Sequence, residues 1–199
     1  MIVDLDNSLA ELLKQELLPV IGSSVNISFA TPDGDFPPSS VTLPAVDLFL
    51  YDVRENMELR SNDWIITKNS DGSTTRKRPP VRVECSYMIT AWPAESTPNP
   101  PQDEHYMLGE VMKVLLRHPV LPNGILKGSL KDQEPPLPTV TLQAGQLQSL
   151  GEFWQALGGK PKAVLNYKVI ISVDVHKTLV SGPAVIDKHL KFKVGTEED

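Results

Sequence analysis

Residues 163–176 form the longest alternating segment of the sequence, and this segment constrains the fold more than any other feature. Alternation with a period of two places successive side chains on opposite faces of a β-strand. At about 3.3 Å per residue the strand would span roughly 40 Å, so it needs neighbouring strands along most of its length. Its apolar face would carry Leu165, Tyr167, Val169, Ile171, Val173 and Val175.

An amphipathic helix is predicted over 145–157, before this strand. Apolar residues recur there at helical spacing: Leu147, Leu150, Phe153, Trp154 and Leu157. Gly158 and Gly159 can supply the left-handed conformation that ends many helices, and Pro161 prevents continuation. The stripe favours burial of Phe153 and Trp154 in the core of the subunit before any role at a contact between subunits.

Two more helices are predicted by leucine-rich periodicity, over 4–18 and over 103–117. Asp4 or Asp6 can serve the N-terminal end of the first helix, where acceptors and negative charge are favoured. Pro19 is expected to end that helix, since a proline cannot donate a helical hydrogen bond.

The remaining alternating segments predict further strands. They lie at 24–30, 44–54, 80–92, 124–130, 138–143 and 184–194. Residues 55–78 predict a hairpin or an ordered excursion with a mobile, basic tip at Arg76, Lys77 and Arg78. Clustered prolines separate the segments and indicate rigid loops rather than linkers between domains.

The order of these elements indicates the fold class. Strands outnumber helices, and consecutive strands are mostly joined without a helical crossover, which favours antiparallel pairing. We therefore expect an α+β fold: a largely antiparallel sheet with about three helices packed on one face, in a single domain. The length of 199 residues suits one domain with a real core.

Composition excludes several classes of function. The net charge of −6 disfavours non-specific nucleic-acid binding, which depends on clustered Lys and Arg. No apolar run approaches the roughly 20 residues that span a bilayer, so no membrane insertion is expected. The opening MIVDLDNSLAELLKQELL has no basic segment typical of a signal peptide, which favours assembly in the cytoplasm.

Residues able to perform chemistry are few. The four histidines, at 105, 118, 176 and 189, show no metal-binding spacing, and the single cysteine, Cys85, alternates with apolar residues as a buried side chain would. Gly158–Gly159–Lys160 follows a helix and precedes a strand, the reverse of a phosphate loop. We expect no enzyme, no cofactor and no metal. A small cytoplasmic enzyme or ligand-binding domain that uses Cys85 and a histidine remains the alternative from another class.

The surface features favour contacts with other proteins. The second faces of the long strands are more apolar than a solvent-facing surface requires, as Phe49, Tyr51 and Ile170 illustrate. Basic residues gather between 54 and 78. The candidate interface residues are Phe49, Tyr51, Arg54, Arg60, Trp64, Arg76, Lys77, Arg78, Phe153 and Trp154.

Four segments carry a resemblance to a known family: VDLFLYDVRENMELRSN (46–62), PPVRVECSYMITAW (79–92), DEHYMLGEVMKVLLRHPVLP (103–122) and LGEFWQALGGKPKAVLNYKVIISVDV (150–175). With the leucine-rich N-terminal helix, the chain resembles the tube-terminator, or cap, family of contractile injection systems, which are phage-tail-like particles. The similarity covers about residues 1–176, the expected cap-like domain, and residues 177–199 would form a C-terminal strand and acidic tail.

The resemblance implies a structural function. Members of that family form a hexameric ring on the distal end of the inner tube and sheath, where the ring ends polymerisation. The implied partners are copies of the same chain, the tube protein and the sheath protein, in a particle assembled in the cytoplasm and released in some cases outside the cell. Longer relatives carry a C-terminal extension, whereas about 24 residues follow Val175 here. The alternative within structural proteins is a tail adaptor or baseplate component.

Overall fold

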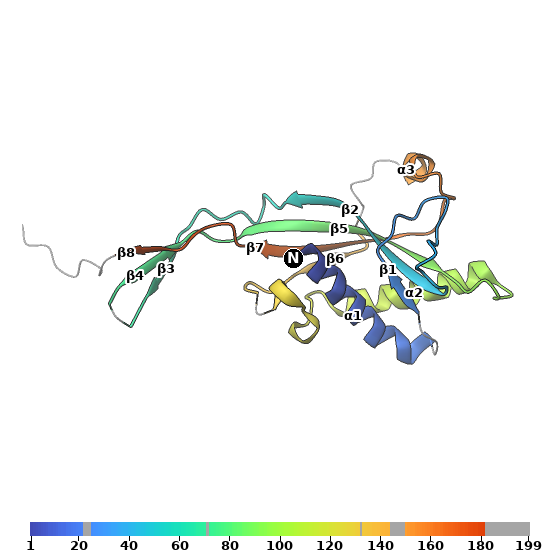
Figure 1. The fold of residues 1–199 in the computed structure, drawn as a ribbon, viewed down its shortest axis with the longest axis horizontal. Helices are drawn as coiled ribbons and strands as arrows, with labels where there is room; N and C mark the ends of the chain where they lie inside the picture. The colour runs from blue at the N-terminus through green and yellow to red at the C-terminus, as the bar shows by residue number, and fades with distance from the viewer. Residues whose placement is uncertain (22–24, 71, 132, 144–149, 182–199) are drawn as a thin grey trace, which may run out of the picture. The chain divides into compact units, whose positions relative to one another are not determined.

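The computed structural model describes residues 1–199 except 22–24, 71, 132, 144–149 and 182–199 (Figure 1). The chain divides into two compact units. The larger unit comprises Met1–Leu59 and Val81–Val173, and the smaller comprises Arg60–Pro80 and Asp174–Asp199. Each unit has its own β-sheet, and the two are described in turn.

A five-stranded sheet forms the centre of the larger unit, with the order β1-β2-β5-β7-β6. Its strands are β1 (Asn26–Ser28), β2 (Ala45–Glu55), β5 (Val81–Trp92), β6 (Thr139–Thr141) and β7 (Leu165–Val173). All pairs are antiparallel except β1 and β2, which are parallel. The α+β class with a largely antiparallel sheet is therefore confirmed.

Two long helices cover one face of this sheet, α1 (Ile2–Ile21) and α2 (Pro100–Arg117), and lie below it in Figure 1. Buried leucines of α1 meet the alternating row of Cys85, Tyr87 and Ile89 on β5 in one apolar core. The expectation that α1 ends at Pro19 is wrong, because the helix continues to Ile21. A proline this close to the helix end removes a single hydrogen bond of the last turn, which costs less than in a helix interior.

The third helix, α3 (Leu150–Ala156), departs from the prediction that all helices share one face. Its Phe153 ring lies 6.2 Å from that of Phe49, which alternates with the core-facing Leu48 and so points to the opposite face of β2. Figure 1 shows α3 above the sheet. The expected left-handed cap is confirmed at Gly158, with a φ of 67°. The rest of the predicted segment, 145–149, lies outside the described residues.

The predicted strand at 124–130 is wrong. This stretch forms two short 3-10 turns, η1 (Asn123–Ile125) and η2 (Gly128–Leu130), and Gly128 has a positive φ of 50° that no extended strand accommodates. The Asp4 carboxylate of α1 accepts hydrogen bonds from Ser129 N at 3.1 Å and Ser129 Oγ at 2.7 Å. Asp4 therefore fixes η2, in addition to its place in the first turn of α1.

The smaller unit contains a three-stranded antiparallel sheet of β3 (Ile65–Lys68), β4 (Thr74–Lys77) and β8 (Leu179–Ser181), in that order. The predicted hairpin over 55–78 is confirmed as β3 and β4. The expectation of a basic tip is wrong, because Arg76 and Lys77 belong to β4 and Arg78 follows it. The predicted strand at 184–194 lies outside the described residues.

Candidate interaction surfaces

The described residues contain no group of three or more His, Cys, Asp and Glu side chains that could hold a metal ion. Cys85 is buried on β5, as expected, and burial raises the pKa of its thiol to about 11. A thiol with so high a pKa remains protonated near neutral pH and is a poor nucleophile. This pKa disfavours the catalytic alternative in which Cys85 acts as a nucleophile.

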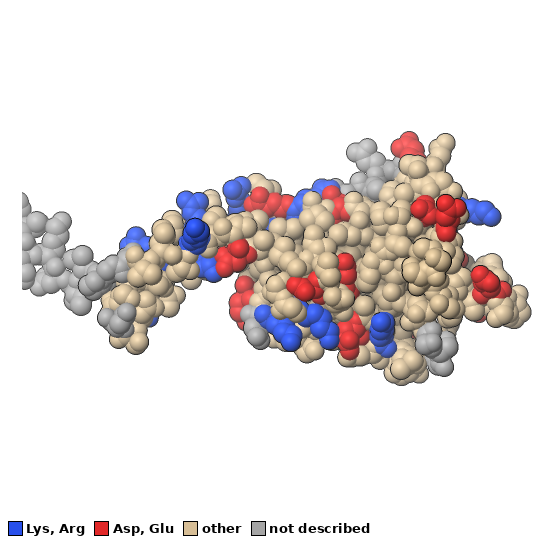
Figure 2. Space-filling model, in the orientation of Figure 1, with Lys and Arg blue, Asp and Glu red and all other residues tan. Residues whose placement is uncertain are grey.

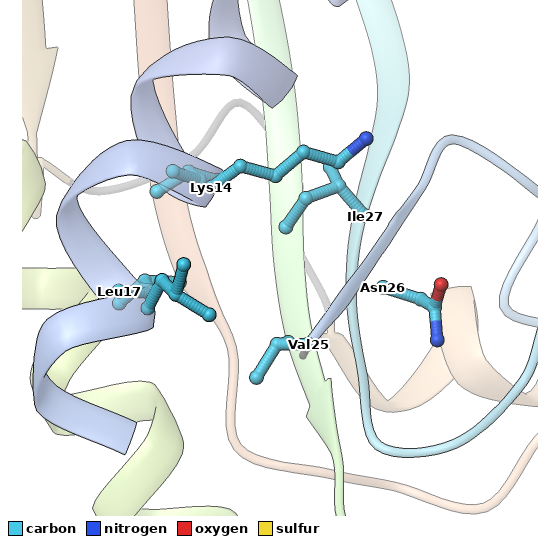
Figure 3. Close-up of a pocket in the computed structure, with 7 residues that line it drawn as sticks. Lys14, Leu17, Val25, Asn26 and Ile27 are labelled. Carbon is cyan, nitrogen blue, oxygen red and sulfur yellow. The ribbon is translucent and has the colours of Figure 1, made fainter. Parts of the chain in front are cut away.

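A groove of about 270 Å³ lies between α1 and the edge strand β1 (Figure 3). Apolar side chains dominate its lining, among them Leu17, Val25 and Ile27. Of its two polar lining residues, Asn26 uses its side-chain amide to donate to the Thr42 carbonyl at 2.7 Å, and Lys14 comes from α1. Binding and active sites usually place several polar groups around an apolar pocket, and this groove does not.

An aromatic cluster occupies the α3 face of the large sheet and unites three of the candidate interface residues. The Phe49 ring lies 6.2 Å from Phe153, which meets Trp154 edge to face at 6.1 Å. Trp154 is only 2% exposed, as its place on the helical stripe indicates. In the single chain this cluster therefore serves packing, with half-buried Phe49 and Phe153 at its rim.

Charged side chains continue the same face of the sheet beyond the aromatic cluster. The Arg54 Nε atom lies 2.6 Å from an Asp52 carboxylate oxygen, and Lys168 Nζ lies 2.8 Å from Glu84. Arg54 is exposed, whereas Tyr51 is half-buried. Because Arg54 is already paired within its strand, it offers a weaker electrostatic contact than an unpaired arginine would.

The other five candidates lie in the smaller unit: Arg60, Trp64, Arg76, Lys77 and Arg78. The Arg78 guanidinium carbon lies 5.3 Å from the centre of the Trp64 ring, a cation–π contact. Lys77 forms an ion pair with Asp174. Figure 2 shows Lys and Arg atoms prominent on this unit. The ten candidates thus fall into separate groups rather than one site.

The exposed aliphatic side chains of the small sheet, chiefly Ile66 and Leu179, were not among the candidate residues predicted from the sequence. Neither was Asp47, a carboxylic acid that is fully buried on the α3 face of β2. Desolvation raises the Asp47 pKa to about 7, against the opposing effects of the Ser28 hydroxyl and the Ala30 amide. The burial of Asp47 could have been predicted from its position, because it is an acidic residue within the alternating apolar segment 44–54. None of the helices among the described residues has the length and apolar character of a membrane span.

These features describe an α+β fold whose candidate residues form aromatic, aliphatic and basic surfaces. The chain belongs to the Pvc16 N-terminal domain family, whose model matches residues 4–187. The resemblance found in the sequence is thereby confirmed. No curated protein matches the chain.

Two solved structures are similar to the chain. The sheath/tube terminator of the extracellular contractile injection system PVC, in its extended state, superposes with a TM-score of 0.70 at 25% identity over 100% of this chain. The tube-terminating cap of the anti-feeding prophage gives a TM-score of 0.58 at 23% identity over 98% of this chain, a likeness of fold. The chain spans 65% and 62% of the lengths of these two proteins.

Proposed function

We propose that this chain is a structural cap that forms a ring on the distal end of a contractile injection system and ends polymerisation of the tube and sheath. The observation that carries the proposal is the similarity over its whole length to a sheath/tube terminator, at a TM-score of 0.70. The ring is a homo-oligomer, a hexamer by family resemblance, with residues 1–176 as the cap-like domain. Its other partners are the inner tube and sheath proteins.

The character of the candidate sites supports a role in assembly. They offer aromatic, aliphatic and basic surface, while the groove of Figure 3 lacks convergent polar groups. A ring multiplies modest contacts by symmetry, so no single surface needs high affinity. The proposed function requires no catalysis, cofactor, nucleic acid or membrane insertion.

A deletion strain tests the function directly. Without a terminator, polymerisation of the tube and sheath is not ended at a defined length. Electron microscopy of purified particles should therefore show tubes of broadly distributed length. The full chain supplied in trans should restore one length. Tubes and sheaths of normal, uniform length in the deletion strain would rule out the cap function.

The position of the chain in the particle separates the cap from a tail adaptor or baseplate component. Gold-labelled antibody against an epitope tag should decorate the end of the particle opposite the baseplate. Labelling at the baseplate end would favour the alternative. Fractionation should find the free chain in the cytoplasm and the particle-bound chain in released particles.

A further inference from the structure

The small sheet has two distinct faces, set by the register of its strands. Ile66 pairs with Arg76, and Arg76 pairs with Leu179, so these three side chains form a row across one face. Lys68 is two residues from Ile66 on β3 and shares that face. At the ends of β3 and β4, Trp64 and Arg78 extend the row through their cation–π contact. We name this surface the Trp64 face; it comprises Trp64, Ile66, Lys68, Arg76, Arg78 and Leu179.

The Trp64 face has the composition of a protein-binding surface. Trp64 is 43% exposed, Ile66 58% and Leu179 53%. Tryptophan and arginine are among the residue types most enriched in side chains that dominate binding energy, and this face contains Trp64, Arg76 and Arg78. A small sheet without a packed apolar face is marginally stable, so covering this face would also stabilise the unit.

The opposite face is less suited to docking. Ile65, Thr67 and Val180 belong to it, and so does Lys77, which pairs with Asp174. On the Trp64 face, by contrast, Arg76 forms no ion pair with any residue that the structure describes. The Trp64 face therefore carries the positive charges of Lys68, Arg76 and Arg78, whereas Lys77 on the opposite face is already paired.

Charge is divided unequally between the two units. The residues of the smaller unit include nine Lys and Arg against seven Asp and Glu, a net charge of +2. Those of the larger unit include ten Lys and Arg against 18 Asp and Glu, a net charge of −8. At least six of the ten basic residues are already in ion pairs within the larger unit. Its surplus acidic residues attract a basic partner.

From this complementarity we infer that the Trp64 face docks on the acidic larger unit of a second copy of the chain. Two different surfaces then meet at each contact, so the contact is head-to-tail and can close into a ring. The inference rests on the proposed function, since a cap needs copies that meet side by side. Beyond that function, the contact joins the Trp64 face of one copy to the larger unit of the next copy.

A cross-linking experiment on the full chain tests this contact. Copies labelled with ¹⁴N and ¹⁵N are mixed, allowed to exchange and treated with a zero-length carbodiimide, which joins a lysine to a carboxylate in direct contact. We expect Lys68 to couple to Asp or Glu residues of the larger unit in peptides of mixed isotope composition. The Lys77–Asp174 pair should couple within one copy and serves as the internal standard.

Three cross-linking outcomes would overturn the inference. These are the absence of Lys68 products, Lys68 products of a single isotope composition, and mixed products that join only smaller units to each other. If no mixed-isotope product forms but the deletion strain has tubes of disturbed length, the docking contact is refuted and the cap function is not. Mixed products from a chain whose deletion leaves tube length unchanged would refute the cap function alone.

Substitutions on the two faces provide a matched comparison. Ile66→Asp and Leu179→Asp place a negative charge on the docking face and should weaken self-association at least about tenfold in sedimentation velocity. Val180→Asp places the same charge on the opposite face, at a residue that is 74% exposed, and should leave self-association unchanged. Equal effects of Leu179→Asp and Val180→Asp would overturn the assignment of the face. Circular dichroism confirms that each variant folds.

Discussion

The phenolic oxygen of Tyr87 lies 2.8 Å from a carboxylate oxygen of Asp6, to which it donates a hydrogen bond that joins β5 to α1 across 81 residues of sequence. Burial raises the Asp6 pKa, and the bond from Tyr87 acts against that shift. The pair is a polar link between the large sheet and the helix α1 that covers it.

Replacement of Tyr87 by Phe should therefore destabilise the chain by about 1–2 kcal/mol, because Asp6 keeps its partly buried charge and loses its donor. Urea denaturation measures the change. Tyr106→Phe is the control, since the Tyr106 hydroxyl makes only a 3.4 Å contact with the Val20 carbonyl at the surface, and it should cost less than about 0.5 kcal/mol. Equal costs would argue against the Tyr87–Asp6 link.

The second prediction concerns Asp47 and pH. Its folded-state pKa of about 7 exceeds the unfolded value near 4, so the folded chain holds a proton that the unfolded chain releases between these values. The contribution of Asp47 to the free energy of unfolding is therefore fully present below about pH 4. It is lost as pH rises to about 7, by at most about 1.4 kcal/mol per pH unit.

Asp47→Asn removes this titration and provides the comparison. The difference in unfolding free energy between the wild type and the variant, measured by urea denaturation from pH 4 to pH 8, should fall with pH and level off above about 7. A difference that stays constant across this range would mean that Asp47 titrates alike in both states.

The third prediction tests the aromatic cluster. Trp154→Ala should cost about 3–5 kcal/mol, because the indole is buried against Phe153 and its removal leaves a cavity. Thermal unfolding measures the loss. An unchanged melting temperature together with lost self-association would instead place Trp154 at a contact between copies.

The fourth prediction concerns the close approach of two loops. A Cβ atom at Gly34 would lie 2.8 Å from the Gly158 carbonyl oxygen, so the backbone must shift to admit any side chain. Gly34→Ala should cost about 1–3 kcal/mol. The control is Gly109→Ala within α2, where the added Cβ would meet nothing within 4 Å beyond the adjacent residues and the helix's own backbone. Helix propensity should there raise stability by up to about 1 kcal/mol. Stabilisation by both substitutions would contradict the close approach.

Alternation predicted β2, β5 and β7 to within a few residues because each buries one row of side chains in the core under α1 and α2. It failed at 124–130, where Ile125 and Leu130 are buried from 3-10 turns. Two buried residues within a short stretch fit a strand and a turn equally well. The local backbone hydrogen bonds and the positive φ of Gly128 decide in favour of turns.

The candidate surfaces were predicted residue by residue, whereas their grouping was not. Trp64 and Arg78 stood out by residue type, but Leu179, which pairs with Arg76 on the same face, is about a hundred residues away and belongs to a three-residue strand. A strand that short contains too few residues to show a period. The parallel pairing of β1 with β2 is also absent from the local pattern, because it depends on the path of the connection over 29–44.

The rows on the two faces of β5 have different neighbours: Cys85, Tyr87 and Ile89 face the helical core, and Met88 and Thr90 are buried on the side of the aromatic cluster. One inserted or deleted residue between Val81 and Trp92 would move the side chains that follow it to the opposite face of the sheet. Residues of the helical core would then face the aromatic cluster, and the reverse. Homologous chains should therefore conserve the length of this strand even where its residues change. Insertions and deletions should gather in the proline-rich loops that connect the elements.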